Sequence, residues 1–415
     1  MINIPQEKLA DRFMRYVQVD TQSDPNSEQY PTTEKQKDLS QILLRELTAL
    51  GLSAETDEYG YVYAELPANS NKTGIPSICF CSHVDTAPDC SGTGVKPILH
   101  RHYQGQDIVL PDDATQVLRK ADSPYLGQCM GHDIITASGN TLLGADDKSG
   151  VAVIMQAVEY LIQHPEIKHG PVKIVFTPDE EVGKGTARIN IQKIGADFAY
   201  TLDGGEAGSL EDETFSADGA SIVVHGVIVH PGYAKDKLKN AIKIISEIID
   251  ELPKTEWSPE TTDGKQGFVH PVSISGIAEK ASADFIVRDF STSALALHHN
   301  RLRKIAESVV ARYPGVSMEY ISREQYRNMK DVLVKFPHVV EYAAEAIRRS
   351  GLQVIQESIR GGTDGSRLSY MGLPCPNIFT GMQNIHSKLE WISVQDMAKA
   401  SETIVHLCMI WEEKS

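Results

Sequence analysis

The sequence predicts an α/β protein whose sheet carries helices on both faces, with a second, smaller domain inserted into the chain. Apolar helices and short apolar strands alternate over residues 144–203, and polar residues follow the ends of several of those strands. The pattern becomes strand-rich between about 212 and 322. At 415 residues the chain exceeds the size at which one hydrophobic core stops growing, so two domains are expected.

The N-terminal elements are two helices and a buried strand. Helices are predicted over residues 8–19 and 34–50, the second because its apolar residues recur every three or four positions until a glycine ends it. The apolar run 77–82 precedes His83, which predicts a buried strand whose carboxyl end carries polar residues. Active sites of open α/β sheets gather at such strand ends.

Residues 144–203 show the most regular alternation. A helix is predicted from about 146 to 163, then a strand at 172–177, then another helix and a strand that ends at Asp203. This order predicts a parallel sheet with helices on both faces. It makes positions 83, 146, 180 and 203 candidates for one shared rim.

The middle of the chain has the order βαββαβ. Strands are expected at 221–229, 267–276, 280–290 and 316–322, and helices at 237–252 and 292–312. This order predicts a ferredoxin-like insert.

After residue 337 the α/β pattern returns. It predicts a helix to Ser350, a strand near 352–359, an apolar segment at 374–380 and a final helix. The insert, 212–322, therefore separates two segments of one domain, 1–211 and 323–415.

Composition argues against several classes of partner. The formal net charge is −16 and no long Lys/Arg run is present, so a nucleic-acid partner is not expected. The N-terminus lacks the pattern of a signal peptide, and no stretch approaches about 18 apolar residues, so we expect a cytoplasmic protein without a membrane partner. The six cysteines contain no CxxC pair and are predicted to be reduced.

His83 and Asp85 lie two residues apart, which places them on the same face of a strand. His83 can therefore bind a metal while Asp85 fixes the tautomer of its ring. An ordinary loop histidine is the alternative, and the pair taken alone favours it.

Four carboxylates follow the other strand ends. Asp146 can ligate a metal or cap the helix that starts there. Glu180 and Glu181 can divide their roles, one holding a cation and the other moving a proton, or belong to a solvated acidic loop. Asp203 precedes two glycines, which an ordinary turn also explains.

His386 follows a second glycine-rich segment far downstream. Each feature has a simple structural explanation, but their coincidence at the strand ends of one sheet favours a shared metal centre.

Together these motifs resemble the co-catalytic zinc metallopeptidases, a family that includes aminotripeptidases, glutamate carboxypeptidase and aminoacylase. The resemblance rests on His-x-Asp at 83–85, Gly-Ala-Asp-Asp-Lys at 144–148, Thr-Pro-Asp-Glu-Glu at 177–181, Leu-Asp-Gly-Gly at 202–205 and the late histidine. It covers nearly the whole chain and is nearest to the aminotripeptidases. It implies a zinc-peptidase-type sheet and makes the insert a lid, of a kind also found at dimer contacts.

The resemblance also implies roles for individual residues. Asp146 would bridge two zinc ions, with His83 and Asp203 completing one site and Glu181 and His386 the other. Glu180 would be the general base, and Asp85 would support His83.

From the insert, His230 would lie over the metals and stabilise the developing oxyanion. Asn240, Arg288 and, from the domain formed by the two outer segments, Arg360 would hold the carboxylate of the substrate, although surface salt bridges are the alternative for them.

The implied activity is release of the N-terminal residue from tripeptides, through a zinc-bridged water that Glu180 activates. A dipeptidase, carboxypeptidase or N-acyl amidohydrolase of the same family would share every ligand. A metal-binding protein without turnover is disfavoured because the full set of site residues is present. The expected cofactor is two Zn²⁺ per subunit, for which cobalt or manganese can substitute, and the expected partners are short peptides, with a homodimer as one possible assembly.

Overall fold

The structure, a computed structural model, describes residues 2–415 and contains two compact units. Unit 1 comprises the chain up to Asp212 together with Met329–Ser358 and Thr363–Ser415, and unit 2 comprises Glu213–Asn328 and Ile359–Gly362. Unit 2 thus extends beyond the predicted insert, 212–322. Its last strand continues to Tyr326, and the backbone N–H of Phe215 donates to the carbonyl oxygen of Ile359 at 3.2 Å.

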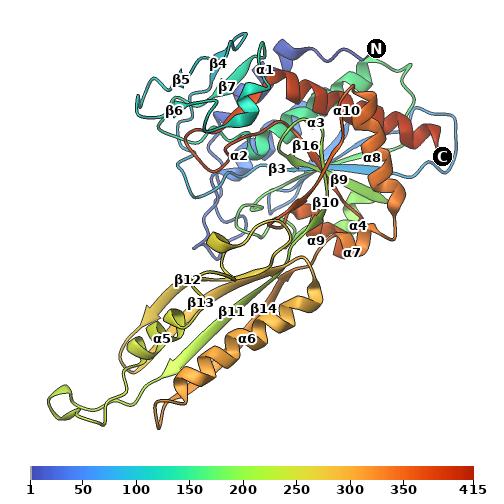
Figure 1. Ribbon diagram of the computed structural model, residues 1–415. Helices are drawn as coiled ribbons and strands as arrows, with labels where there is room; N and C mark the ends of the chain where they lie inside the picture. The colour runs from blue at the N-terminus through green and yellow to red at the C-terminus, as the bar shows by residue number, and fades with distance from the viewer. Residues whose placement is uncertain (1) are drawn as a thin grey trace. The chain divides into compact units, whose positions relative to one another are not determined.

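Unit 1 is built on an eight-stranded sheet of order β1-β2-β8-β3-β9-β16-β10-β15 (Figure 1). The strands are β1 Ser53–Thr56, β2 Val62–Leu66, β3 Ile78–His83, β8 Val172–Thr177, β9 Phe198–Gly204, β10 Ser209–Thr214, β15 Ile355–Ile359 and β16 Asn377–Phe379. The central strands β8, β3, β9 and β16 run parallel. The predicted α/β fold class is confirmed.

The outer strands add antiparallel pairs to the parallel strands that residues 144–203 predict. Strand β2 is antiparallel to both β1 and β8, and β10 is antiparallel to β16. The connection between β1 and β2 is only a short turn, which can join antiparallel strands but not parallel ones.

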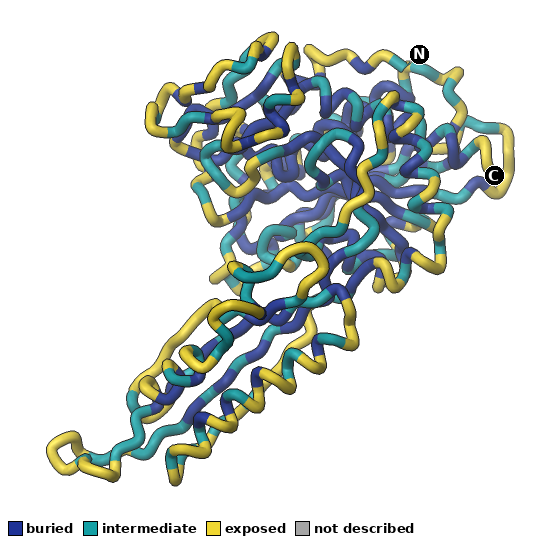
Figure 2. The backbone as a smooth tube through the Cα atoms, viewed as in Figure 1, coloured by how far each residue is buried: buried dark blue, intermediate teal, exposed yellow. Residues whose placement is uncertain are grey.

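Helices cover both faces of this sheet, as predicted. The helices of unit 1 are α1 Gln6–Val17, α2 Gln36–Ala49, α3 Ala145–Gln163, α4 Ile191–Ile194, α7 Lys330–Leu333, α8 Pro337–Arg349, α9 Asp364–Tyr370 and α10 Val394–Glu413. In β3, Ile78 and Phe80 join the core that includes α1, α2, α3, α8 and α10, whereas Cys79 and Cys81 join a second core with α4 and α9. Figure 2 shows the buried sheet centre in dark blue.

Residues 84–143, for which the sequence predicts no element, contain four short strands. Strands β4 (Ile98–His100) and β7 (Ile134–Thr136) form a small sheet with β17 (Trp391–Ser393) from the C-terminal part of the chain, and β5 (Ile108–Val109) pairs with β6 (Val117–Leu118). The pairing of β17 with β7 fixes the segment that follows His386.

Unit 2 has the predicted βαββαβ order. Its elements are β11 Ser216–His225, α5 Ala241–Asp250, β12 Phe268–Gly276, β13 Lys280–Asp289, α6 Thr292–Val310 and β14 Ser317–Tyr326. The antiparallel sheet has the order β12-β13-β11-β14, and both helices pack on one face of it (Figure 1). The ferredoxin-like arrangement is confirmed, although β11 starts at Ser216 instead of residue 221.

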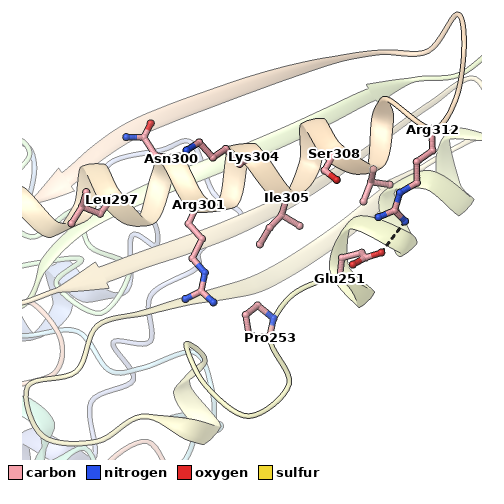
Figure 3. A pocket seen from close by; sticks show the side chains of 10 residues that line it. Glu251, Pro253, Leu297, Asn300, Arg301, Lys304, Ile305, Ser308 and Arg312 are labelled. Carbon is pink, nitrogen blue, oxygen red and sulfur yellow. Dashed lines mark hydrogen bonds and ion pairs between the residues drawn. The ribbon is translucent and has the colours of Figure 1, made fainter.

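A cavity of about 670 Å³ in unit 2 lies along α6 (Figure 3). Its wall includes Ile305 and the ion pair between Arg312 and Glu251, whose atoms Nη1 and Oε1 are 2.8 Å apart.

Among residues 2–415, no helix combines the length and the apolar character that crossing a bilayer requires.

Candidate metal centre

Three parallel strands bring the polar residues together. His83 is the last residue of β3, Asp203 lies near the end of β9, and Glu180 and Glu181 follow β8. His83 is in register with Thr177 at the end of β8. Because parallel strands end at the same edge of a sheet, these side chains share one rim.

The start of α3 adds Asp146 to this rim. Gly150 allows the approach, since a Cβ atom at this position would lie 1.9 Å from the carbonyl oxygen of Leu202 in β9. Asp146 has the non-helical angles φ −81° and ψ 107°, and its two carboxylate oxygens face His83 and His386, whereas the N–H of Gly150 in the first turn donates to Oδ1 of Asp147 at 3.3 Å. The helix-cap alternative for Asp146 is therefore excluded.

Asp146 lies between two histidines. Its Oδ1 is 3.0 Å from Nε2 of His83, and its Oδ2 is 3.2 Å from Nε2 of His386. Each carboxylate oxygen thus faces a different imidazole, which is the arrangement a carboxylate needs to bridge two cations. The remaining residues divide into a His83 half and a His386 half.

The His83 half contains His83 and Asp203. Nε2 of His83 lies 3.9 Å from Oδ1 of Asp203, and atoms of His83, Asp147 and Asp203 are close enough together to hold one ion. Asp147 already accepts hydrogen bonds from the hydroxyl of Ser82 and the backbone N–H of His83. Asp147 therefore positions the end of β3. Asp203 is the carboxylate in this half that is more available to bind an ion.

The His386 half contains Glu181 and His386. Nε2 of His386 is 3.0 Å from Oε2 of Glu181, while Oε1 of Glu181 is buried and has no hydrogen-bond partner. His83, Asp146 and Glu181 also form a group that can hold one ion. A buried carboxylate oxygen without a donor is costly unless a cation satisfies it, so this donor set fits a metal.

The protonation of these groups reflects their crowding. Burial and the neighbouring Asp146 raise the pKa of Glu181 to about 7, and burial together with Asp147 and Asp146 raises the pKa of Asp203. Hydrogen bonds to Asp146 and Glu181 raise the pKa of His386 to about 11. Divalent cations would offset the clustered negative charge and keep the carboxylates ionised.

Asp85 supports the centre in two ways. Its Oδ1 lies 3.3 Å from Nδ1 of His83, which leaves Nε2 of that ring to face Asp146. Its two oxygens also accept hydrogen bonds from the backbone N–H groups of Glu180, at 3.0 Å, and Glu181, at 3.2 Å. One buried carboxylate therefore orients a histidine and the pair of glutamates.

Asp179 shows that the acidic run is not a solvated loop. It is buried, accepts hydrogen bonds from Thr32 N at 2.8 Å and Gln36 Nε2 at 2.7 Å, and donates its own backbone N–H to Gln36 Oε1 at 3.0 Å. These contacts hold the turn that presents Glu180 and Glu181.

Two further residues at the centre are missing from the sequence prediction. Oδ2 of Asp89 is 3.3 Å from Nδ1 of His386, so Asp89 orients His386 as Asp85 orients His83. Glu390 is buried and accepts hydrogen bonds from Leu143 N, Gly144 N and Asp146 N at 2.7, 2.7 and 2.9 Å. The sequence offers one signal that could have identified these two residues. Asp89 lies shortly after the His-x-Asp motif, and Glu390 lies shortly after His386.

The other predicted site residues lie in unit 2. His230 is exposed and its Nδ1 accepts from Gly232 N at 3.1 Å, and Asn240 caps α5 by accepting from Ile242 N at 2.9 Å. Arg288 donates to the backbone oxygen of Asp218 at 3.1 Å. His230, Asn240 and Arg288 are therefore not part of the cluster of site residues in unit 1.

Arg360 also belongs to unit 2, which corrects its assignment to the larger domain. Its guanidinium donates to the carbonyl oxygens of Gly264 and Gln266, at 2.7 and 3.1 Å, and lies over the ring of Phe215. These contacts draw residues 359–362 into unit 2.

A parallel-centred α/β unit with a carboxylate between two histidines and a glutamate pair at the strand ends defines a dinuclear metallohydrolase. The family model for peptidase family M20/M25/M40 matches residues 141–410, and the chain belongs to this family of metallopeptidases. The resemblance found in the sequence is confirmed.

Individual relatives are similar over their full length. Peptidase T of Geobacillus thermodenitrificans is 47% identical over 410 residues, covering 99% of each chain. The crystal structure of aminopeptidase PepT from Bacillus cereus superposes with a TM-score of 0.76 at 23% identity, covering 99% of each chain. That of the Bacillus subtilis YXEP protein, a dinuclear metal binding peptidase from the M20 family, gives a TM-score of 0.66 at 15% identity, again covering 99% of each chain.

Proposed function

We propose that this chain is a metal-dependent aminopeptidase that releases the N-terminal residue from tripeptides. The observation that carries the proposal is the position of Asp146, with one carboxylate oxygen toward His83 and the other toward His386. The relatives named peptidase T match along nearly the whole chain and support a peptidase, and the resemblance of the motifs to the aminotripeptidases supplies the proposed substrate class.

His83, Asp203 and Asp146 would hold one cation, and Asp146, Glu181 and His386 the other, as the distances among these side chains support. When bound, such a pair lowers the pKa of a shared water and polarises a carbonyl group. The nitrogen and oxygen donors suit zinc, and carboxylate-rich sites also accept cobalt or manganese. We propose zinc at both positions.

Glu180 is the proposed general base. Among the described residues, Glu181 pairs with His386 at 3.0 Å and belongs to a group able to hold an ion, whereas Glu180 forms no such pair and belongs to no such group. The Glu180 carboxylate is thus left to accept a proton from the attacking water and return it to the leaving amine, while Asp85 holds its backbone. Burial raises the pKa of Glu180 well above its usual value.

From unit 2 we propose His230 as the group that stabilises the developing oxyanion, and Asn240, Arg288 and Arg360 as contacts of the substrate. An exposed imidazole is available for such a role. His230→Ala should lower kcat by about 10²-fold or more with both metals retained. Unchanged turnover would remove His230 from the mechanism.

We also predict that the protein is cytoplasmic and that a homodimer is one possible assembly.

A panel of peptides tests the proposed activity. The protein is incubated with free and N-acetylated di-, tri- and tetrapeptides, with and without a chelator, and the products are identified by mass. We expect the free tripeptides to lose their first residue and the chelator to stop the reaction. Cleavage confined to acetylated peptides would indicate an N-acyl amidohydrolase, and release of the last residue would indicate a carboxypeptidase.

A further inference from the structure

A second cluster of metal-ligating side chains lies in unit 1 outside the catalytic set. It consists of Cys129, His132 and Asp396. Cys129 follows the 3₁₀ helix Pro124–Gly127, His132 precedes β7, and Asp396 lies in the first turn of α10. The pairing of β7 with β17, which runs directly into α10, brings these distant segments together.

The three side chains point toward one another. Sγ of Cys129 is 3.9 Å from Oδ2 of Asp396, and Nδ1 of His132 is 3.8 Å from Oδ1 of Asp396. With ordinary zinc bond lengths, tetrahedral geometry separates such ligand pairs by about 3.4–3.6 Å. The two observed separations, one to each oxygen of Asp396, exceed this range by a few tenths of an ångström, and one ligand atom from each of the three residues lies within 4.8 Å of the others.

The surroundings favour a cation. Cys129 and Asp396 are buried, and Glu206 adds a carboxylate whose charge acts on both. Within residues 2–415, no lysine or arginine forms an ion pair with Asp396, and the ring nitrogen near it belongs to His132, whose pKa burial lowers. Burial raises the pKa of the Cys129 thiol and, together with Glu206, the pKa of Asp396 to about 6.

The hydroxyl of Tyr125 donates to Oδ2 of Asp396 at 3.1 Å. Such a contact fixes the orientation of a ligating carboxylate. His132 now pairs through Nδ1 with the hydroxyl of Ser393 at 2.8 Å, a contact that it would exchange for a metal. A thiolate, an imidazole and a carboxylate form a donor set that selects zinc over magnesium or calcium.

We propose that Cys129, His132 and Asp396 bind a third divalent cation of the zinc class, separate from the catalytic pair. Binding releases the thiol proton of Cys129 to solvent and joins the loop 129–132 to the start of α10. The site contributes no ligand to the catalytic centre. Its occupancy should therefore leave peptide cleavage unchanged.

Cobalt distinguishes the two kinds of site. None of the residues gathered at the catalytic centre is a cysteine, so thiolate-to-cobalt charge-transfer absorption in the near ultraviolet reports the third site alone. Metal-free protein is titrated with Co²⁺ while this absorption, the bound metal per chain and peptide cleavage are recorded. We expect three equivalents of metal and the thiolate band.

Single substitutions test whether the thiolate-to-cobalt absorption band arises from Cys129. Cys129→Ser and His132→Asn should each reduce the bound metal to two equivalents. Cys129→Ser should abolish the band, and both variants should retain tripeptide cleavage. Cys90→Ser is the matched control, because Cys90 is a half-buried free thiol outside the cluster, and it should keep all three equivalents. Circular dichroism confirms that each variant is folded.

Two results would overturn the proposal: saturation at two equivalents without the thiolate band, or a band that persists in Cys129→Ser. A third equivalent that gives no band would also overturn it, because the extra ion would then lie elsewhere. Absence of tripeptide cleavage in wild-type protein at two as well as at three equivalents of metal would instead count against the proposed function. The two failures are therefore distinguishable.

Discussion

The two halves of the metal centre use the same kinds of residue but are built differently. His83 closes a central strand, and its side chain is 3% exposed, whereas His386 lies in a loop with φ +60° and is 38% exposed. The carboxylate behind His83, Asp85, is fully buried, and the one behind His386, Asp89, is 62% exposed. One half is thus part of the sheet, and the other is attached to it by loops.

This difference predicts how tightly each half of the centre binds its metal. A buried histidine and carboxylate lose little entropy when an ion binds, because the strand already holds them in place. The looser His386 half offers solvent a path to the centre and contains the unpartnered oxygen of Glu181. We therefore expect the His83 half to bind its metal more tightly and the His386 half to exchange its metal first.

The largest expected effect separates Glu180 from Glu181, the adjacent glutamates. Glu180→Gln removes the base but no ligand, so kcat should fall by at least about 10²-fold while both metals stay bound. Glu181→Gln removes a ligand of the His386 half, so its loss of activity should accompany loss of one metal and respond to added zinc. Metal analysis beside steady-state kinetics measures both outcomes.

The reverse pattern, in which Glu180→Gln loses a metal and Glu181→Gln keeps two but does not turn over, would exchange the two roles. If neither change affected the reaction, the centre itself would be misassigned. Glu180→Asp is a useful companion, because it retains the carboxylate and should recover part of the activity if proton transfer is the missing step.

The features that the sequence predicts best are those with a local pattern. Alternation over residues 144–203 predicts the parallel centre of the sheet, and the polar residues after each strand predict which side chains share its rim. The boundaries of unit 2 are less clear because β14 is mostly exposed at its end and carries charged residues there, so its hydrophobic signal stops at about residue 322 although pairing continues to Tyr326.

The supporting residues have no such pattern. Glu390 accepts hydrogen bonds from the turn at Leu143–Asp146. It lies 244 positions after Asp146 in the chain, so only the folded structure brings the two segments together. Asp89 resembles any exposed loop aspartate until His386 is placed beside it. Gly150 is predicted as an ordinary helix residue, since the carbonyl oxygen that it approaches belongs to a different element.

The next effect concerns the carboxylates behind the two histidines. Changing such a partner typically weakens metal binding by about 10–100-fold. We expect Asp85→Asn near the upper end, because Asp85 is buried and also holds the two glutamates, and Asp89→Asn near the lower end. Competition with a chelator of known affinity measures both constants.

Asp107→Asn is the control for these variants, since Asp107 has similar exposure to Asp89 and pairs with Arg119 outside the centre. It should leave both constants unchanged. Equal losses in Asp85→Asn and Asp89→Asn would mean that burial does not distinguish the halves, and the proposed order of metal exchange would then be wrong.

The smallest expected effect is the pH dependence of stability in the metal-free protein. Glu181 has a folded-state pKa of about 7 against an ordinary value of 4.5, so folding is penalised progressively as the pH rises from 4.5 to 7. His386 has a raised pKa of about 11, so the stability that it contributes is complete below pH 6.5 and is lost only as the pH rises toward 11. Both signs make the metal-free protein less stable at higher pH. Bound metal keeps both groups deprotonated in the folded state, so the metal-loaded protein instead gains stability as the pH rises through their ordinary pKa values of 4.5 and 6.5.

Melting curves of the metal-free and metal-loaded protein should therefore separate more widely at pH 7.5 than at pH 5.5. Because Glu181 shares its charge with His386, we expect its part to be about 1 kcal/mol, or about 2–4 °C in Tm. Glu181→Gln should remove that part from the metal-free protein and flatten its pH profile. If the profile of Glu181→Gln matched that of the wild type, the titration would belong to the His83 half, where burial also raises the pKa of Asp203, and the more strongly pH-dependent half of the centre would be the buried one.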